Sequence, residues 1–278
     1  MYEFTPSDFA NTLARHSRRL RVGPLALALA CVVSLAAPAQ AAEDAQALLV
    51  RADSMRNPDG DFSVTTTLAE YRSGKLVDSS TLVVYSKLVP ESAQYNNLIR
   101  FVSPRRDAGK LILRNGMEVW FFDPASKASI RISPQARLLG QASNGDVMST
   151  NLAKVYTASI VGHEPIEDEA KQQRPSVKLH LVSQRNDAPY SMVDYWVDEE
   201  NGRPLKAQFF TSEGRLLKTA YFRKFQTILG RERPTETVII DGLDPAWITV
   251  IRASKFQSRE IPKTWLQRDY LPHFRGET

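Results

Sequence analysis

The sequence predicts a mainly β protein with helices (α+β), built on a large antiparallel sheet that is closed or strongly curved. After residue 60, apolar and polar residues alternate with a period of two along most of the chain, and hairpin-type turns join the alternating runs. Helices that alternate with strands are missing, which argues against a parallel α/β sheet. The composition, 42% hydrophobic and 24% charged over 278 residues, is that of a globular protein and excludes a disordered or collagen-like chain.

One amphipathic helix opens the predicted domain. In residues 43–57 the apolar positions recur every three or four residues, which places them on one stripe of a helix, and Pro58-Asp59-Gly60 ends it. Turns such as Ser73-Gly74-Lys75, Asn115-Gly116 and Asn201-Gly202 then separate extended runs. These runs predict strands at residues 62–68, 76–88, 97–102, 110–114, 117–123, 128–132, 176–183, 191–198, 204–211, 215–225, 235–241 and 247–256.

One long interval, residues 133–176, shows no strand pattern. It contains Ser143-Asn144-Gly145 and a possible short helix at residues 149–156. A loop of this length inside a compact domain is usually a lid, a binding loop or a disordered excursion. The composition does not change along the rest of the chain, so we expect a single domain over residues 42–278.

The first 41 residues have the order of a secretory signal peptide. Four arginines between residues 15 and 21 precede an apolar stretch, and the small residues Ala39-Gln40-Ala41 follow it. We therefore expect cleavage after Ala41 and a periplasmic protein, exported by the general or the twin-arginine route. Cys31 is the one cysteine of the chain; a lipidated Cys31 is the alternative, but the apolar run continues past it. Cleavage removes four arginines against Glu3 and Asp8, which lowers the formal charge from +5 to +3 and leaves no case for nucleic acid.

The sequence carries no pattern that predicts catalysis, a metal or a cofactor. His163, His180 and His273 are far apart, and no nucleophile elbow, phosphate-binding loop or zinc motif occurs. Acidic residues cluster at Glu164, Glu167, Asp168 and Glu169, but their spacing matches no calcium loop and predicts a solvated turn. Scattered carboxylates that pair in space remain compatible with a hydrolase.

Aromatic residues on both faces of a strand are the most distinctive feature. In residues 117–123, Trp120 and Phe122 point to one side, while Val119 and Phe121 point to the other. A strand that is apolar on both faces needs both covered, by other protein or by a bound ligand. Tyr195-Trp196-Val197 has the same character.

These segments, in this order, resemble the LolA-like family of outer-membrane lipoprotein-sorting proteins. The resemblance rests on the amphipathic helix, on the run from Asn115-Gly116 to Asp123-Pro124, and on residues 191–198 followed by Asn201-Gly202-Arg203-Pro204. It implies an incomplete barrel wrapped around helices, with an apolar cavity for acyl chains. By the resemblance, the candidate lining residues are Trp120, Phe122, Tyr195 and Val197. The family's arginine before a proline is replaced here by Lys87-Leu88-Val89-Pro90, and Arg105-Arg106 one strand later are possible substitutes.

The resemblance implies a non-enzymatic periplasmic carrier for lipids or acylated lipoproteins, without a cofactor. Its partners would be the cargo, an inner-membrane transporter and an outer-membrane acceptor. A lipid-binding sensor that controls a membrane partner is the first alternative, and a periplasmic hydrolase is the second.

Overall fold

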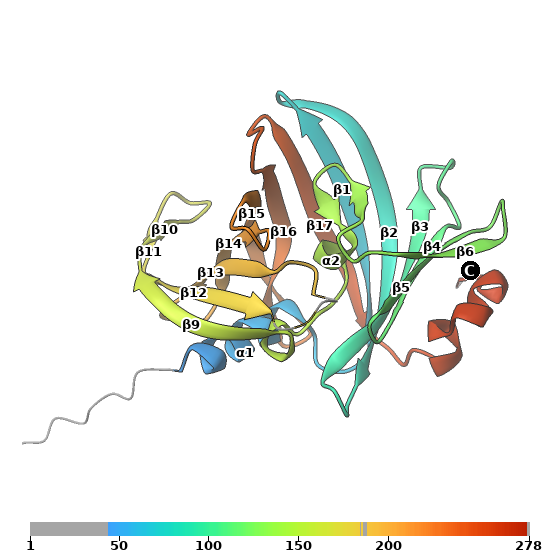
Figure 1. Ribbon diagram of the computed structural model, residues 1–278, viewed down its shortest axis with the longest axis horizontal. Coiled ribbons are helices and arrows are strands. Elements are labelled where there is room, and N and C mark those ends of the chain that lie inside the picture. Colours follow the sequence, from blue (N-terminus) through green and yellow to red (C-terminus); the bar gives the residue numbers. More distant parts are fainter. Residues whose placement is uncertain (1–43, 184, 186–187, 277–278) are drawn as a thin grey trace, which may run out of the picture. The chain divides into compact units, whose positions relative to one another are not determined.

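The computed structural model describes residues 44–183, 185 and 188–276, so the predicted signal peptide and Cys31 lie outside the described residues. Thirteen strands form one antiparallel sheet, which confirms the predicted mainly β fold (Figure 1). In spatial order the sheet consists of β6 (Ala128–Ile132), β5 (Glu118–Asp123), β4 (Leu111–Asn115), β3 (Gln94–Ser103), β2 (Lys75–Val89), β1 (Phe62–Arg72), β17 (Trp247–Ser258), β16 (Arg231–Asp241), β15 (Leu216–Ile228), β14 (Pro204–Phe210), β13 (Met192–Asp198), β12 (Ser176–Ser183) and β9 (Tyr156–His163).

The sheet is a meander joined at one long-range pair. Strands that follow one another in sequence pair in the sheet, except that β6 and β9 form its two edges. The long-range pair joins β1 to β17, in a register that places Leu68 opposite Ile251. Among the described residues no ladder joins β6 to β9, so the barrel is not closed. The main core nevertheless unites Val119 of β5 with Leu181 of β12, strands far apart in the sheet order. Side chains from such distant strands meet because the sheet is curved, and the main core fills its concave face.

Helix α1 (Ala45–Arg56) packs on this concave face, against β9, β13, β14 and β16. Asp44 caps its first turn by accepting a hydrogen bond of 3.3 Å from the Gln46 N–H. The predicted apolar stripe is buried except at its end, with Leu49 and Ala52 fully shielded from solvent and Met55 half-buried. The Gln46 side chain completes the free edge of β9: its amide donates to the Tyr156 carbonyl and accepts from the Ala158 N–H, at 3.2 and 3.0 Å. Edge groups that would otherwise be unpaired are thereby satisfied.

The chain between the two sheet edges, residues 133–155, is named here the edge connection. It contains the two-stranded pair β7 (Arg137–Leu139) and β8 (Ala142–Ser143), the short helix α2 (Asn144–Val147) and the turn η1 (Leu152–Lys154). It leaves β6, crosses the concave face and enters β9 (Figure 1). The possible helix at residues 149–156 was wrong in its extent, because only Leu152–Lys154 is helical and Tyr156 already belongs to β9.

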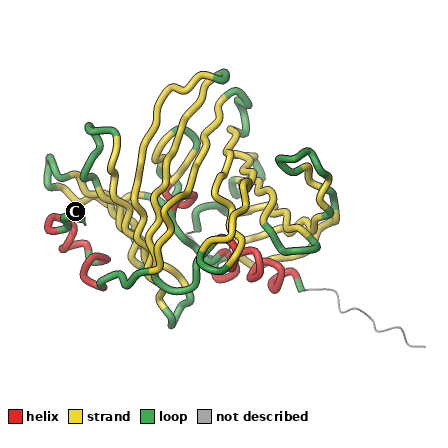
Figure 2. The backbone as a smooth tube through the Cα atoms, turned by 180° about the vertical axis from the view of Figure 1, so that it is seen from behind, coloured by secondary structure: helices red, strands yellow, loops and turns green. Residues whose placement is uncertain are grey.

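A second core lies on the opposite, outer face of the sheet. The C-terminal turns η2 (Lys263–Leu266) and η3 (Arg268–His273) cover β3, β4 and β5 there (Figure 2). Phe274, Trp265 and Tyr85 stack edge to face, with ring centroids 5.0 to 5.8 Å apart. A separate hairpin of β10 (Ile166–Glu167) and β11 (Gln173–Arg174) precedes β12.

Candidate functional site

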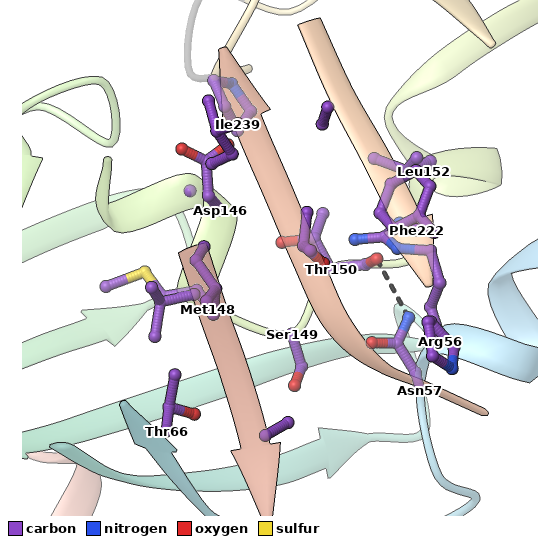
Figure 3. Close-up of a pocket in the computed structure, with 18 of the residues that line it drawn as sticks. Arg56, Asn57, Thr66, Asp146, Met148, Ser149, Thr150, Leu152, Phe222 and Ile239 are labelled. Atoms are coloured by element: carbon purple, nitrogen blue, oxygen red, sulfur yellow. Dashed lines mark hydrogen bonds between the residues drawn. The ribbon is translucent and has the colours of Figure 1, made fainter. Parts of the chain in front are cut away.

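A pocket of about 150 Å³ lies between the edge connection and the concave face of the sheet. Figure 3 shows Asp146, Met148, Ser149 and Thr150 of the connection together with Phe222 and Ile239 of the sheet. The lining is mostly apolar, and its larger apolar side chains are Phe62, Val64, Met148, Val193, Phe209, Phe222, Ile239, Ile251 and Phe256. Apart from Met148 of the edge connection, these residues lie on β1, β13, β14, β15, β16 and β17. Phe62 and Val64 of β1 are two positions apart, so the period of the strand places both on the pocket side.

Ser149 and Thr150 of the edge connection are fixed by buried polar side chains of β3, β4 and the residue that follows α1. Asn97, fully buried in β3, accepts from the Ser149 N–H at 3.0 Å and donates to the Ser149 carbonyl at 3.1 Å. Arg114 of β4 donates to the Thr150 hydroxyl at 2.7 Å, and Asn57 donates to the Thr150 carbonyl at 3.0 Å. A buried polar group raises the free energy of the folded protein unless it is hydrogen-bonded. These hydrogen bonds therefore favour the position in which the edge connection lies against the sheet.

The arginine that contacts the edge connection is therefore Arg114, rather than either residue of the Arg105-Arg106 pair. Arg106 pairs with Asp78 at 2.7 Å on an exposed turn, and Arg105 is exposed. Arg114 is only 7% exposed and lies near the end of β4, directly before the predicted Asn115-Gly116 turn.

Residues 141–146 of the edge connection are fixed by a buried ion pair and the hydrogen bonds around it. Lys218 of β15 pairs with Asp146 of α2 and donates to the Gln141 carbonyl at 3.0 Å. The Tyr190 hydroxyl donates to Asp146 at 3.0 Å and is 2.9 Å from the Ser143 hydroxyl. Burial lowers the pKa of the Lys218 ammonium, and the neighbouring Asp146 carboxylate opposes that shift. Burial also raises the pKa of Tyr190 well above its usual value, so this hydroxyl remains a donor.

Asp53 joins the edge connection to α1. Its carboxylate accepts from the Ala153 N–H at 2.8 Å and from Arg56 at 3.3 Å. Burial raises the pKa of Asp53 to about 6, although Arg56 and the backbone N–H groups favour the charged form.

Of the four predicted lining residues, Tyr195 lines the pocket and Val197 lies in the main core beside it. Both are buried, and the ring of Tyr195 stands edge to face with Phe222 at 6.0 Å. Trp196, between them in sequence, is buried on the outer face, where its indole N–H donates to Glu164 and the Lys178 and Lys206 ammonium groups lie 4.8 and 4.3 Å from its ring centre.

The prediction that Trp120 and Phe122 point inward was wrong. Phe122 belongs to the second core, under the C-terminal turns, and Trp120 packs against the same cluster with Arg268 4.3 Å from its ring centre. Val119 and Phe121 face the main core instead. The physical reason is that both faces of β5 are covered by protein, so an apolar side chain gives no direction by itself.

The residues of the edge connection are functional candidates that no motif in the sequence indicates. Two of their partners carried a readable signal. Lys218 stands at an inward position between Leu216 and Ala220 in an alternating strand. Asn97 is the polar member of the alternate positions Tyr95, Asn97, Ile99 and Phe101, which form the inward face of β3. A buried polar residue in such a pattern indicates a specific partner.

The acidic cluster lies in and beside the β10–β11 hairpin. Asp168 accepts from the Ala170 and Gln172 N–H groups and from Arg174, at 2.8 to 2.9 Å, which is the bonding of a closed turn. Across residues 44–183, 185 and 188–276, no group of three or more His, Cys, Asp or Glu side chains is placed to hold a metal ion. No helix in the described part of the chain has the length and apolar character needed to span a membrane.

Comparisons with known proteins place the chain among solved structures of this fold. A family model whose description reads "Uncharacterized protein" matches residues 93–273, and no curated protein sequence matches the chain. The chain is similar to the crystal structure of a LolA superfamily protein from Nitrosomonas europaea, with 31% identity and a TM-score of 0.74. That alignment covers 82% of this chain and 100% of the other.

Two more distant structures share the fold. One is a putative outer membrane lipoprotein-sorting protein domain from Vibrio parahaemolyticus, with 18% identity, a TM-score of 0.69 and coverage of 82% and 98% of the two chains. The other is a DUF1329 family protein from Desulfovibrio piger, with 21% identity, a TM-score of 0.69 and coverage of 82% and 97%.

Proposed function

The chain belongs to the LolA superfamily, and on that premise we propose that it is a non-enzymatic periplasmic carrier that binds the acyl chains of lipids or lipoproteins. The observation that carries the proposal is the apolar pocket between the edge connection and the concave face of the sheet. The similar Vibrio parahaemolyticus structure, described as a putative lipoprotein-sorting domain, supports the class of cargo.

The driving force for loading is the burial of methylene groups. Each buried methylene contributes about 0.8 kcal/mol, so ten supply about 8 kcal/mol before ordering costs, which leaves enough for micromolar binding. This interaction needs no charge within the pocket between the edge connection and the sheet, which is named here the acyl pocket.

A complete acyl chain is larger than the pocket. At about 150 Å³ its volume is that of a cavity known to hold a single benzene molecule. In our proposal, loading therefore displaces residues 149–150 of the edge connection from the sheet, while residues 141–146 stay bound to Lys218. The hydrogen bonds of residues 149–150 to Asn57, Asn97 and Arg114 each contribute about 1 kcal/mol, so breaking them costs less free energy than the burial of ten methylenes supplies.

Cargo extraction is the direct test. Organic extraction and mass spectrometry of the protein purified from the periplasm should recover acyl lipids or acylated peptide. Binding of a fluorescent fatty-acid probe to the delipidated protein should saturate at micromolar concentration. A folded wild-type protein that binds no apolar probe contradicts the proposal.

A pair of variants on one strand locates the site. Ala253 of β17 lines the pocket, and its neighbour Ser254 points to the other face and is exposed. Ala253→Phe fills the pocket and should weaken probe binding at least tenfold, at a cost of about 1 to 3 kcal/mol in stability. Ser254→Phe adds the same ring outside the pocket and should bind the probe as wild type does.

A transfer measurement separates the carrier from a lipid-binding sensor. A carrier passes its probe from donor to acceptor vesicles, whereas a sensor retains it until a membrane protein partner is added. The inner-membrane transporter and outer-membrane acceptor that we propose as partners should accelerate loading and release, respectively.

Export is tested by intact mass. The periplasmic protein should begin at Ala42, after the small residues Ala39-Gln40-Ala41. A mature protein that begins at a diacylated Cys31 contradicts this and moves the carrier to a membrane surface.

A further inference from the structure

A second pocket, of about 500 Å³, lies beside the acyl pocket. The two share a wall: Tyr190 lines both, Lys218 lines the second, and its ion-pair partner Asp146 lines the first. The Lys218 ammonium lies 5.0 Å from the ring centre of Tyr190 and 5.5 Å from that of Phe209, which lines the acyl pocket. A polar partition thus separates an apolar compartment from a second, polar one.

The lining of the second pocket is cationic. Arg137 and Arg215 contribute guanidinium groups, and within the described part of the chain neither has a carboxylate within 4.0 Å. Arg137 stacks over Trp247, with 4.8 Å between its guanidinium carbon and the ring centre. Its charge also acts on Lys218, where it adds to the lowering of the ammonium pKa. Asp241 is the one carboxylate among the described lining residues, and one of its oxygens accepts from two backbone N–H groups.

A buried donor without an acceptor lies in the same lining. Gln141 is 6% exposed, and its side-chain amide nitrogen has no hydrogen-bond partner among the described residues. Its backbone is fully used, because the N–H donates to Thr249 at 2.8 Å and the carbonyl accepts from Lys218. A buried amide donor with no acceptor is costly, and a ligand oxygen would satisfy it.

From this arrangement we propose that the second pocket binds the anionic head group of the acyl cargo, a phosphate or a carboxylate. The inference rests on the carrier function proposed above. Phosphate and carboxylate oxygens accept from the planar guanidinium fork and from amide N–H groups. Arg137 and Arg215, which have no carboxylate partner among the described residues, and Gln141 supply these donors. The acyl chain then enters the neighbouring apolar pocket past Tyr190 and the Lys218–Asp146 pair. The carrier would thus prefer anionic amphiphiles over neutral ones.

The test compares ligands with one chain and different heads. Delipidated mature protein, residues 42–278, is titrated with dodecyl phosphate, dodecanoate, dodecanol and inorganic phosphate, by calorimetry or displacement of the fluorescent probe. Wild type should bind at least one anionic amphiphile ten times more tightly than dodecanol, and this ratio should fall at high salt. The comparison of dodecyl phosphate with dodecanoate identifies the head group.

Variants connect the preference to the pocket. The double variant Arg137→Gln/Arg215→Gln should bring the anion-to-alcohol ratio close to one without changing dodecanol binding, and Gln141→Leu should lower the ratio severalfold. Arg105→Gln, which removes an exposed arginine outside this pocket, should leave the ratio unchanged.

Different results overturn different statements. If dodecanol and the anions bind equally well, or if the double variant keeps the wild-type ratio, the head-group site is wrong and the acyl carrier stands. If inorganic phosphate binds as tightly as dodecyl phosphate, the pocket is a free-anion site and the head-group assignment is wrong. If no amphiphile binds the folded protein, the proposed carrier function itself fails.

Discussion

At the residue scale, a few buried polar side chains hold the edge connection in one defined position, which apolar packing by itself does not specify. The main core would accept many apolar arrangements, whereas a buried polar group needs a hydrogen-bonding partner in a defined position. Asn97, Arg114, Asp53 and Lys218 each have such a partner in the edge connection. Two of these contacts lead to stability predictions.

Removal of the Lys218 charge should destabilise the protein strongly. Lys218→Met leaves the Asp146 carboxylate buried without its counter-charge, which costs about 3 to 5 kcal/mol in the free energy of unfolding. In the double variant Lys218→Met/Asp146→Asn the neutral amide still accepts from Tyr190, so at least half of the loss should be recovered. Urea unfolding followed by circular dichroism measures both, and a single variant as stable as wild type would contradict the prediction.

Asp53 should make stability fall as the pH rises from about 4 to 7. An Asp carboxyl has a pKa of about 3.9 in an unfolded chain. The folded value of about 6 means that the folded protein holds the proton more tightly. The stability that protonated Asp53 contributes is therefore complete below about pH 4 and is lost as the pH passes through the folded pKa, an effect of about 2 to 3 kcal/mol.

The control for this pH effect is Asp53→Asn, which cannot ionise. The free energy of unfolding of wild type, taken relative to Asp53→Asn, should decrease between about pH 4 and pH 7, and the subtraction cancels the other titrating groups. A difference that stays constant, or that rises with pH, would show that Asp53 titrates at its ordinary value.

At the scale of elements, the C-terminal turns have a structural role that is separate from the pocket. They cover the outer face of β3 to β5, whereas the pocket lies on the concave face. Phe274→Ala should lower the free energy of unfolding by about 3 kcal/mol through a cavity among Tyr85, Trp265 and Phe122, and leave the affinity for an apolar probe unchanged. A folded Phe274→Ala protein that loses probe binding would mean that the two faces of the sheet are coupled.

The edge strand β9 is the strand of the sheet that the sequence did not predict, whereas the other edge strand, β6, was predicted with its observed bounds. β9 was absent from the predicted strands because its residues Ala158, Ser159, Ile160 and Val161 do not alternate clearly, and most of the strand is exposed. The Gln46 amide supports its free edge, and this partner is more than a hundred residues away in the chain. Central strands, each flanked by a core on at least one face, show the alternation that makes them readable.

At the scale of the whole molecule, the family resemblance read from the sequence is confirmed by the 31% identity over the full length of the Nitrosomonas europaea structure. The open sheet and its edge connection give the fold a pocket without a closed barrel. Neither the fold nor the pocket uses a metal in our account. Melting temperatures with and without EDTA should therefore coincide, and a large drop that calcium reverses would mean that Glu164, Glu167, Asp168 and Glu169 form a site.

The sequence by itself determined the helix α1, which it predicted over residues 43–57 and which the structure shows at Ala45–Arg56, together with twelve of the thirteen strands of the sheet and the hairpins between them. These features depend on periods and turns within a few neighbouring residues, which a linear pattern records. Tertiary structure alone decided which face of β5 points inward, where the edge connection lies and which arginine holds it. These outcomes depend on residues distant in the chain: the C-terminal turns cover Phe122, and Thr150 meets Arg114 only after the sheet has curved. A strand that is apolar on both faces has no inward side until other elements cover each face.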